Sequence, residues 1–146
     1  MNIPFSPPDI TEEEIEAVAE VMRSGWITTG PKTKELERKM AEFTHTNRGV
    51  CLNSATSCME MALRLFEIGP GDEVIVPAYT YTASASVVCH VGATLRLVDV
   101  EKGTFHIDYA AVESMINENT KAIIPVDLGG VMVDYDRIRA IVCLLY

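Results

Sequence analysis

The sequence predicts an α/β protein with a mainly parallel sheet covered by helices on both faces, a three-layer α/β/α arrangement. Short apolar runs that fit buried strands occur at 49–52, 73–76, 94–98 and 122–126. Helical segments of about ten or more residues lie between them, which is the spacing of parallel strands joined by crossover helices. Ligands of such sheets bind beyond the carboxyl ends of the strands, so we look for a site there.

Two helices are predicted before the first strand. Thr11 and Glu14 have the spacing of a capping box, and a helix that begins there should end before Gly25. Pro31 suits the first position of a second helix. The apolar face of that helix would consist of Leu36, Met40 and Phe43. Trp26, in the loop between the helices, is interpreted as a core anchor in preference to a direct ligand contact.

Composition and cap residues also predict the later helices. Small and apolar residues from Ala83 to Val91 indicate a buried helix. Asp108 can cap a helix that reaches about Ile116, and Asp134 or Asp136 can cap the next one.

Asn53–Ser57 is a polar turn that leads into a predicted helix. The free N–H groups of a first helical turn and the positive end of the helix dipole favour an anion. Ser54, Thr56 and Ser57 add hydroxyl donors, so a phosphate group is a candidate ligand. Alternatively, these residues only cap the helix, because Ser and Thr are ordinary cap residues.

Two further stretches, Tyr79–Thr82 and Asp127–Gly130, also follow predicted strands and could meet the turn at Asn53–Ser57 in one crevice. The sequence contains neither the glycine fingerprint of dinucleotide-binding folds nor the phosphate loop of nucleoside triphosphatases. A smaller ligand that carries a phosphate is therefore favoured.

Charge and composition exclude several classes of partner. The net charge is -9 and the basic residues are scattered, which argues against nucleic acid and anionic membranes. No apolar run approaches the roughly 18 residues of a membrane span, and the N-terminus lacks signal-peptide features, so we expect a cytoplasmic protein. Neither disulfides nor a metal site is expected from the spacing of Cys51, Cys58, Cys89, Cys143, His45, His90 and His106.

Seven stretches of the chain carry a resemblance to a known family, and they lie at 26–31, 53–57, 71–77, 79–81, 92–93, 98–99 and 120–126. In this order they resemble the N-terminal part of the DegT family of pyridoxal-phosphate-dependent sugar aminotransferases, which are fold-type I enzymes. The resemblance covers essentially the whole chain, although family members normally run to well over twice this length. It implies one incomplete large domain over 1–146, with a helical segment at 1–47 and strand–helix units at 48–146.

The resemblance also implies roles for individual residues. Thr56 and Ser57 match the positions that hold the cofactor phosphate, and Tyr81 matches the aromatic residue that stacks on the pyridine ring. Thr29 and Gly30 lie in a loop that approaches the substrate, often across a dimer interface. Without the resemblance, Tyr81 would be interpreted as a half-buried tyrosine at the start of a helix.

The family's Schiff-base lysine and the aspartate that protonates the pyridine lie beyond the fourth strand. None of the five lysines matches the first position, and Asp127 matches a different family position, so no catalytic residue is assigned. The first functional hypothesis is the N-terminal part of an enzyme that moves an amino group from an amino acid, such as glutamate, to a nucleotide-linked keto sugar. The second is an inactive truncated chain that binds a full-length relative, and in either case we expect a homo-oligomer.

Overall fold

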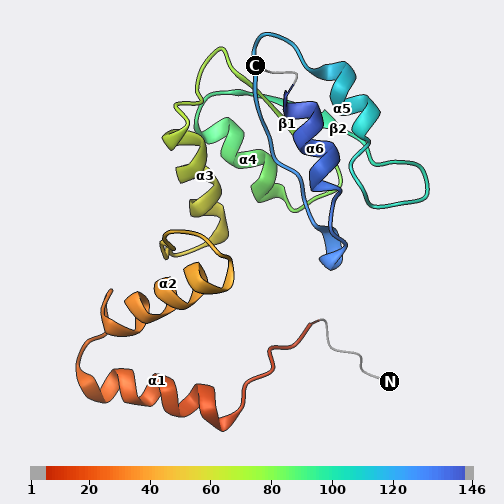
Figure 1. Ribbon diagram of the computed structural model, residues 1–146. Coiled ribbons are helices and arrows are strands. Elements are labelled where there is room, and N and C mark those ends of the chain that lie inside the picture. The colour runs from red at the N-terminus through yellow and green to blue at the C-terminus, as the bar shows by residue number, and fades with distance from the viewer. Residues whose placement is uncertain (1–5, 144–146) are drawn as a thin grey trace. The chain divides into compact units, whose positions relative to one another are not determined.

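The computed structural model describes residues 6–143. Its contacts divide the chain into two units, unit 1 up to Cys51 and unit 2 from Leu52 onward. Figure 1 shows the elements of each unit in chain order. None of the helices within 6–143 combines the length and the apolar character that crossing a membrane would require.

Unit 1 consists of α1 (Glu12–Ser24) and α2 (Pro31–Phe43). The predicted capping box is present, because the Thr11 N–H donates to Glu14 Oε2 at 2.7 Å while the Thr11 hydroxyl accepts from the helix backbone. Gly25 ends α1 in the left-handed conformation, with φ 71°, and Pro31 occupies the first turn of α2. The predicted start and end of α1 and the predicted start of α2 are confirmed.

The apolar faces of α1 and α2 remain exposed. None of the residues of either helix is buried. On the predicted apolar face of α2, Leu36 is 51%, Met40 47% and Phe43 80% exposed. An amphipathic helix normally covers such a face with another element, and the described part of the chain supplies no such cover.

The predicted strand at 49–52 is wrong. These residues form no strand, and Val50 is 75% exposed. The Cys51 N–H donates to Glu37 Oε1 at 2.9 Å, and Gly49 lies so close to α2 that a Cβ there would come within 2.6 Å of the Glu37 carbonyl oxygen. The segment therefore runs along α2 and has no ladder partner within 6–143.

Unit 2 contains the sheet, whose strands are β1 (Glu73–Pro77), β2 (Thr94–Val98) and β3 (Thr120–Ile123). Their order is β2-β1-β3 and both pairs are parallel. The parallel α/β fold predicted from the sequence is confirmed, with three strands among the described residues in place of the four predicted.

The strand predicted at 122–126 is shifted toward the N-terminus. Pairing begins at Thr120, and the last ladder bond runs from Ile124 N–H to the Ile75 carbonyl at 2.9 Å. Pro125 follows and has no N–H to donate, so the ladder cannot continue through it.

Helices cover the sheet on both faces. Ser54, Asp108 and Asp134 accept hydrogen bonds from the first turns of α3, α5 and α6 and cap them. In Figure 1, α3 and α4 lie next to each other on one side of unit 2, with α5 and α6 on the other. The helices are α3 (Ala55–Leu65), α4 (Thr82–His90), α5 (Tyr109–Met115) and α6 (Tyr135–Val142), and a short 3₁₀ turn spans Leu128–Gly130.

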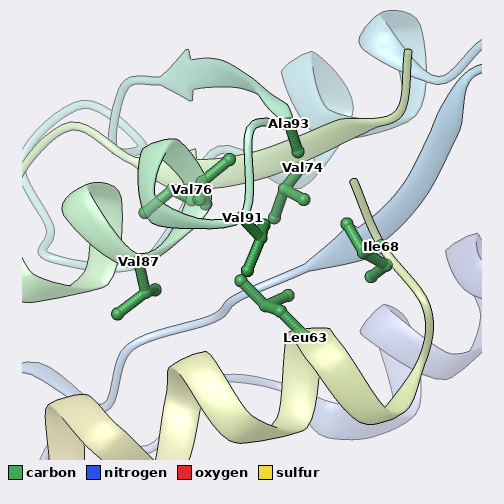
Figure 2. Close-up of a cluster of buried hydrophobic side chains, with 8 residues drawn as sticks. Leu63, Ile68, Val74, Val76, Val87, Val91 and Ala93 are labelled. Atoms are coloured by element: carbon green, nitrogen blue, oxygen red, sulfur yellow. The ribbon is translucent and has the colours of Figure 1, made fainter. Parts of the chain in front are cut away.

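The core of unit 2 consists of two apolar clusters, one on each face of β1. Val74 and Val76 pack with Leu63 of α3 and Val87 of α4, as Figure 2 shows. Ile75 points to the other face and packs with residues of α5 and α6. All three strand residues are fully buried, which matches the continuous apolar run expected of a central parallel strand.

The side chain of Ile75 is buried between the sheet and helices α5 and α6. Ile75→Ala should therefore lower the free energy of unfolding by about 2–5 kcal/mol, and Ile75→Val by roughly 1 kcal/mol. Leu97→Ala is the control, since Leu97 is 53% exposed and its loss should change stability by less than about 0.5 kcal/mol. Urea unfolding followed by circular dichroism measures all three. Equal losses for Ile75→Ala and Leu97→Ala would contradict the described core.

Candidate functional site

The carboxyl ends of the parallel strands lie at one edge of the sheet of unit 2. Residues 78–81 follow β1 there, and 124–127 follow β3. The C-terminal end of α3 leads through the turn at 69–72 to the amino end of β1, and α3 packs on the sheet, so α3 runs antiparallel to β1. Its first turn, Ala55–Ser57, is therefore directed toward the carboxyl edge.

The three predicted stretches thus lie at the same edge of the sheet. Within residues 6–143 no hydrogen bond joins one of them to another. The turn at Asn53–Ser57 is also preceded by the extended segment along α2 and not by the predicted strand. The candidate anion site is consequently a loop-to-helix site.

The first turn of α3 holds several unused donors. Ser54 Oγ accepts from Ser57 N–H at 3.1 Å and donates to Ser57 Oγ at 3.0 Å. The first main-chain N–H groups of a helix have no partner within the helix, which leaves those of Ala55 and Thr56 for a ligand. Thr56 and Ser57 are half-buried, and the Ser57 hydroxyl proton is not needed by Ser54. The turn can therefore donate to an anion from both main-chain and hydroxyl groups.

The two tyrosines after β1 differ in what their rings contact. Tyr79 is stacked on Phe105, with ring centroids 5.6 Å apart and an angle of 22° between the planes. Tyr81 caps α4 and is 82% exposed, and its carbonyl accepts from Ser84 N–H at 3.0 Å. Tyr81 is therefore the tyrosine whose ring faces are open to a ligand.

Asp127 is engaged by its own loop. Its carboxylate accepts from Val133 N–H at 2.8 Å and from the Tyr135 hydroxyl at 2.9 Å. This hydrogen bond, together with partial burial and the nearby negative charge, raises the pKa of Tyr135. Asp127 thus holds the loop that precedes α6.

In unit 1, Trp26 organises the loop that contains Thr29 and Gly30. The indole N–H donates to the Thr29 carbonyl at 3.0 Å. Gly30 is buried under the same ring, where an added Cβ would lie 2.4 Å from the indole Cδ1 and Nε1 atoms. Trp26 is 57% exposed, so it anchors this local turn and does not fill a core.

A cavity of about 440 Å³ adjoins this loop within unit 1. Its lining includes Val21 of α1, Trp26, and Lys32 of α2. Lys32 Nζ lies 3.6 Å from Glu20 Oε2. Gly30 lines this cavity, whereas Thr29 is exposed and is not one of the lining residues.

Two long-range contacts within unit 2 were not predicted from the sequence. Glu60 of α3 bonds to His90 of α4 across 30 positions, and Tyr79 stacks on Phe105 across 26. The spacing of Glu60 and Arg64 on one helix could have indicated their ion pair. No local signal in the sequence indicates the Glu60–His90 bond or the Tyr79–Phe105 stack.

Several solved structures that share this fold are described as aminotransferases. Spr1654 of Streptococcus pneumoniae, assigned as a sugar aminotransferase, is 61% identical over 97% of this chain and 35% of its own, with a TM-score of 0.93. It is known in apo, pyridoxamine-phosphate (PMP) and pyridoxal-phosphate (PLP) forms.

Two more distant relatives share the fold over a similar part of their length. The aminotransferase of Psychrobacter cryohalolentis is 34% identical, with a TM-score of 0.90 over 97% of this chain and 37% of its own. DesV of S. venezuelae is 37% identical, with a TM-score of 0.86 over 91% and 36%. This chain therefore spans little more than a third of the length of the relatives it matches.

These relatives place the fold in the class of fold-type I pyridoxal-phosphate enzymes, as the N-terminal part of the large domain. The model of the DegT/DnrJ/EryC1/StrS aminotransferase family matches residues 8–143, nearly the whole chain. The chain belongs to this family, and the predicted membership is confirmed.

Gly30→Ala should displace the indole of Trp26, because the added Cβ would overlap the ring. Since Trp26 is the only tryptophan, its fluorescence emission should change in maximum and intensity. Thr29→Ala is the control, since the indole bonds to the main-chain carbonyl of Thr29 and that bond is kept. An unchanged emission spectrum in Gly30→Ala would contradict the geometry of this loop.

Proposed function

We propose that this chain is the N-terminal part of a pyridoxal-phosphate-dependent aminotransferase that transfers an amino group from an amino acid, such as glutamate, to a nucleotide-linked keto sugar. In this proposal Thr56 and Ser57 hold the cofactor phosphate and Tyr81 stacks on its ring. The observation that carries the proposal is the arrangement at the carboxyl edge, where the first turn of α3 and the exposed Tyr81 ring lie at the same end of unit 2. The PMP and PLP forms of the S. pneumoniae relative support the choice of cofactor.

The residues present fit two parts of pyridoxal phosphate. Its phosphate suits the unpaired N–H groups of Ala55 and Thr56 and the hydroxyls of Thr56 and Ser57. Its flat ring suits the open face of Tyr81, since an aromatic side chain fixes the plane of a ring by apolar contact. When bound, pyridoxal phosphate supplies an electron sink for the reacting carbon of the amino acid.

The polar groups of the chain would then bind and orient and would not react. Ser54 holds Ser57 in place, which directs the Ser57 hydroxyl proton away from the cap. Ser84 N–H bonds to the carbonyl of Tyr81 and so holds the main chain from which the ring projects. The Ser54–Ser57 bonds order a ligand-facing side chain before the ligand arrives, which lowers the entropic cost of binding.

The roles of Thr29 and Gly30, the extent of the domain and the cellular location remain predictions. We propose that Thr29 and Gly30 lie on the substrate side. The indole of Trp26 bonds to the main-chain carbonyl of Thr29, and the exposed Thr29 side chain would then be the part that meets the substrate. We also propose that the 1–47 and 48–146 segments belong to one incomplete large domain in a cytoplasmic enzyme.

Thr56→Ala should weaken binding of pyridoxal phosphate to the 146-residue chain by about 1 kcal/mol, the usual net value of one hydrogen bond. The effect is modest because the main-chain donors of the turn remain. Isothermal titration measures the dissociation constants. Thr94→Ala is the matched control, since Thr94 is exposed at the amino edge of the sheet, and it should leave the constant unchanged.

A second measurement tests the site directly. In an NMR titration, the amide signals of Asn53–Ser57 should shift as pyridoxal phosphate or inorganic phosphate is added. The absence of shifts at millimolar ligand would mean that the anion site is not formed.

A second candidate function rests on the exposed apolar faces of unit 1. The chain would be catalytically inactive and would associate with a second copy of itself or with a full-length relative. Met22 and Phe43 are 68% and 80% exposed, and contiguous exposed apolar surfaces favour association.

Sedimentation velocity at tens of micromolar protein should therefore show a species larger than the 16.1 kDa monomer. Phe43→Glu should shift the distribution toward monomer, because it places a charge on the apolar face of α2. Lys34→Glu is the control, since Lys34 lies on the same helix outside that face. A single compact 16.1 kDa species for the unmodified chain would contradict association.

A further inference from the structure

The two helices that begin at the candidate site are packed together by an apolar cluster and one hydrogen bond between side chains. Leu63 of α3 belongs to the same buried cluster as Val87 and Val88 of α4. The polar contact joins Glu60 Oε2 to His90 Nδ1 at 2.9 Å. Among residues 6–143 it is the one hydrogen bond between side chains of α3 and α4. Apolar contacts are non-directional, so this bond restricts how α3 can rotate and slide against α4.

The Glu60 carboxylate is held on both oxygens. Arg64 donates to Oε1 from Nε at 3.0 Å and from Nη2 at 2.8 Å, while His90 contacts Oε2. Hydrogen bonds from Arg64 and then from His90 keep the pKa of Glu60 below its usual range. The side chain of Glu60 is 29% exposed and that of His90 50%. The carboxylate is therefore charged and oriented near neutral pH.

The same contact connects the phosphate-facing turn to the tyrosine. Glu60 lies four residues after Thr56, so the two share a face of α3 about 6 Å apart along its axis. His90 is the last residue of α4, and Tyr81 caps the other end of that helix. Both helices run antiparallel to β1, and their first turns point toward the same sheet edge. A rotation or slide of α3 at Glu60 would therefore move Thr56 relative to Tyr81.

We propose that Glu60 and His90 are positioning residues that set the phosphate-binding turn of α3 relative to the ring of Tyr81. This inference rests on the proposed function of Thr56, Ser57 and Tyr81. The affinity for a ligand that contacts only the turn does not depend on where the turn lies relative to Tyr81. The affinity for a ligand that contacts both the turn and the ring does depend on it.

The test compares two probes, pyridoxal phosphate and inorganic phosphate, on the 146-residue chain. His90→Ala should raise the dissociation constant for pyridoxal phosphate about two- to fivefold, the range that the strength of exposed ion pairs allows. It should leave the constant for inorganic phosphate unchanged. His90→Asn should restore pyridoxal-phosphate binding, because its amide nitrogen can replace the imidazole Nδ1 as the partner of Glu60.

Two further variants separate positioning from a general loss of stability. The double variant Glu60→Ala/His90→Ala should bind pyridoxal phosphate no more weakly than Glu60→Ala alone, as expected when both residues act through one contact. Arg139→Gln removes an exposed ion pair from α6 of the same unit and should change neither constant. Thermal unfolding by circular dichroism confirms that each variant is folded.

Failure of the inference and failure of the proposed function give different results. If the unmodified chain binds pyridoxal phosphate but His90→Ala weakens both probes equally, or neither probe, the positioning role is overturned. If the unmodified chain binds neither probe, the proposed function fails, and the positioning role fails with it.

Discussion

Burial of β1 on both faces is the constraint on which unit 2 depends. Val74, Ile75 and Val76 are fully buried, so neither face of the strand can be left to water and helices must cover both. The parallel pairing of β1 with β2 and β3 then requires crossover connections, and the helices return antiparallel to the strands. α4 is one of these crossover helices, and α3, which leads directly into β1, packs on the sheet antiparallel to that strand, so the first turns of both helices lie at the carboxyl edge.

Two features at the carboxyl edge suit a ligand. The first turn of α3 has unpaired donors because a helix cannot satisfy its own first N–H groups, and Ser54 settles only one of them. Tyr81 is 82% exposed and its ring is open, whereas the ring of Tyr79 stacks on Phe105. A phosphate attached to a flat ring uses both features, whereas a free anion uses only the first. This difference favours a cofactor of the pyridoxal-phosphate type over simple anion binding.

Local chemistry explains what could be predicted from the sequence. The bounds of α1 follow from its capping box and Gly25, and α3 and α5 begin after the cap residues Ser54 and Asp108. Each of these signals depends on residues within one or two turns, so no distant partner is needed. The family fragments are likewise short, and their order in the chain identified the family.

Non-local contacts explain what was missed. A strand at 49–52 would need a neighbouring strand, and the segment instead bonds to Glu37 of α2. The partners Glu60 and His90 lie 30 positions apart, a separation at which the sequence gives no periodic signal. The roles of Thr29 and Gly30 depend likewise on tertiary structure, since Gly30 leaves room for the indole of Trp26.

The most direct test of the central claim is an NMR measurement of pyridoxal phosphate bound to the 146-residue chain. If the first turn of α3 and the ring of Tyr81 form one site, the amides of Thr56 and Ser57 should shift during the titration. In the same sample, nuclear Overhauser effects should connect the ring and methyl protons of the ligand to the ring protons of Tyr81. Shifts at the turn without contacts to Tyr81, or contacts confined to scattered lysines, would contradict the account.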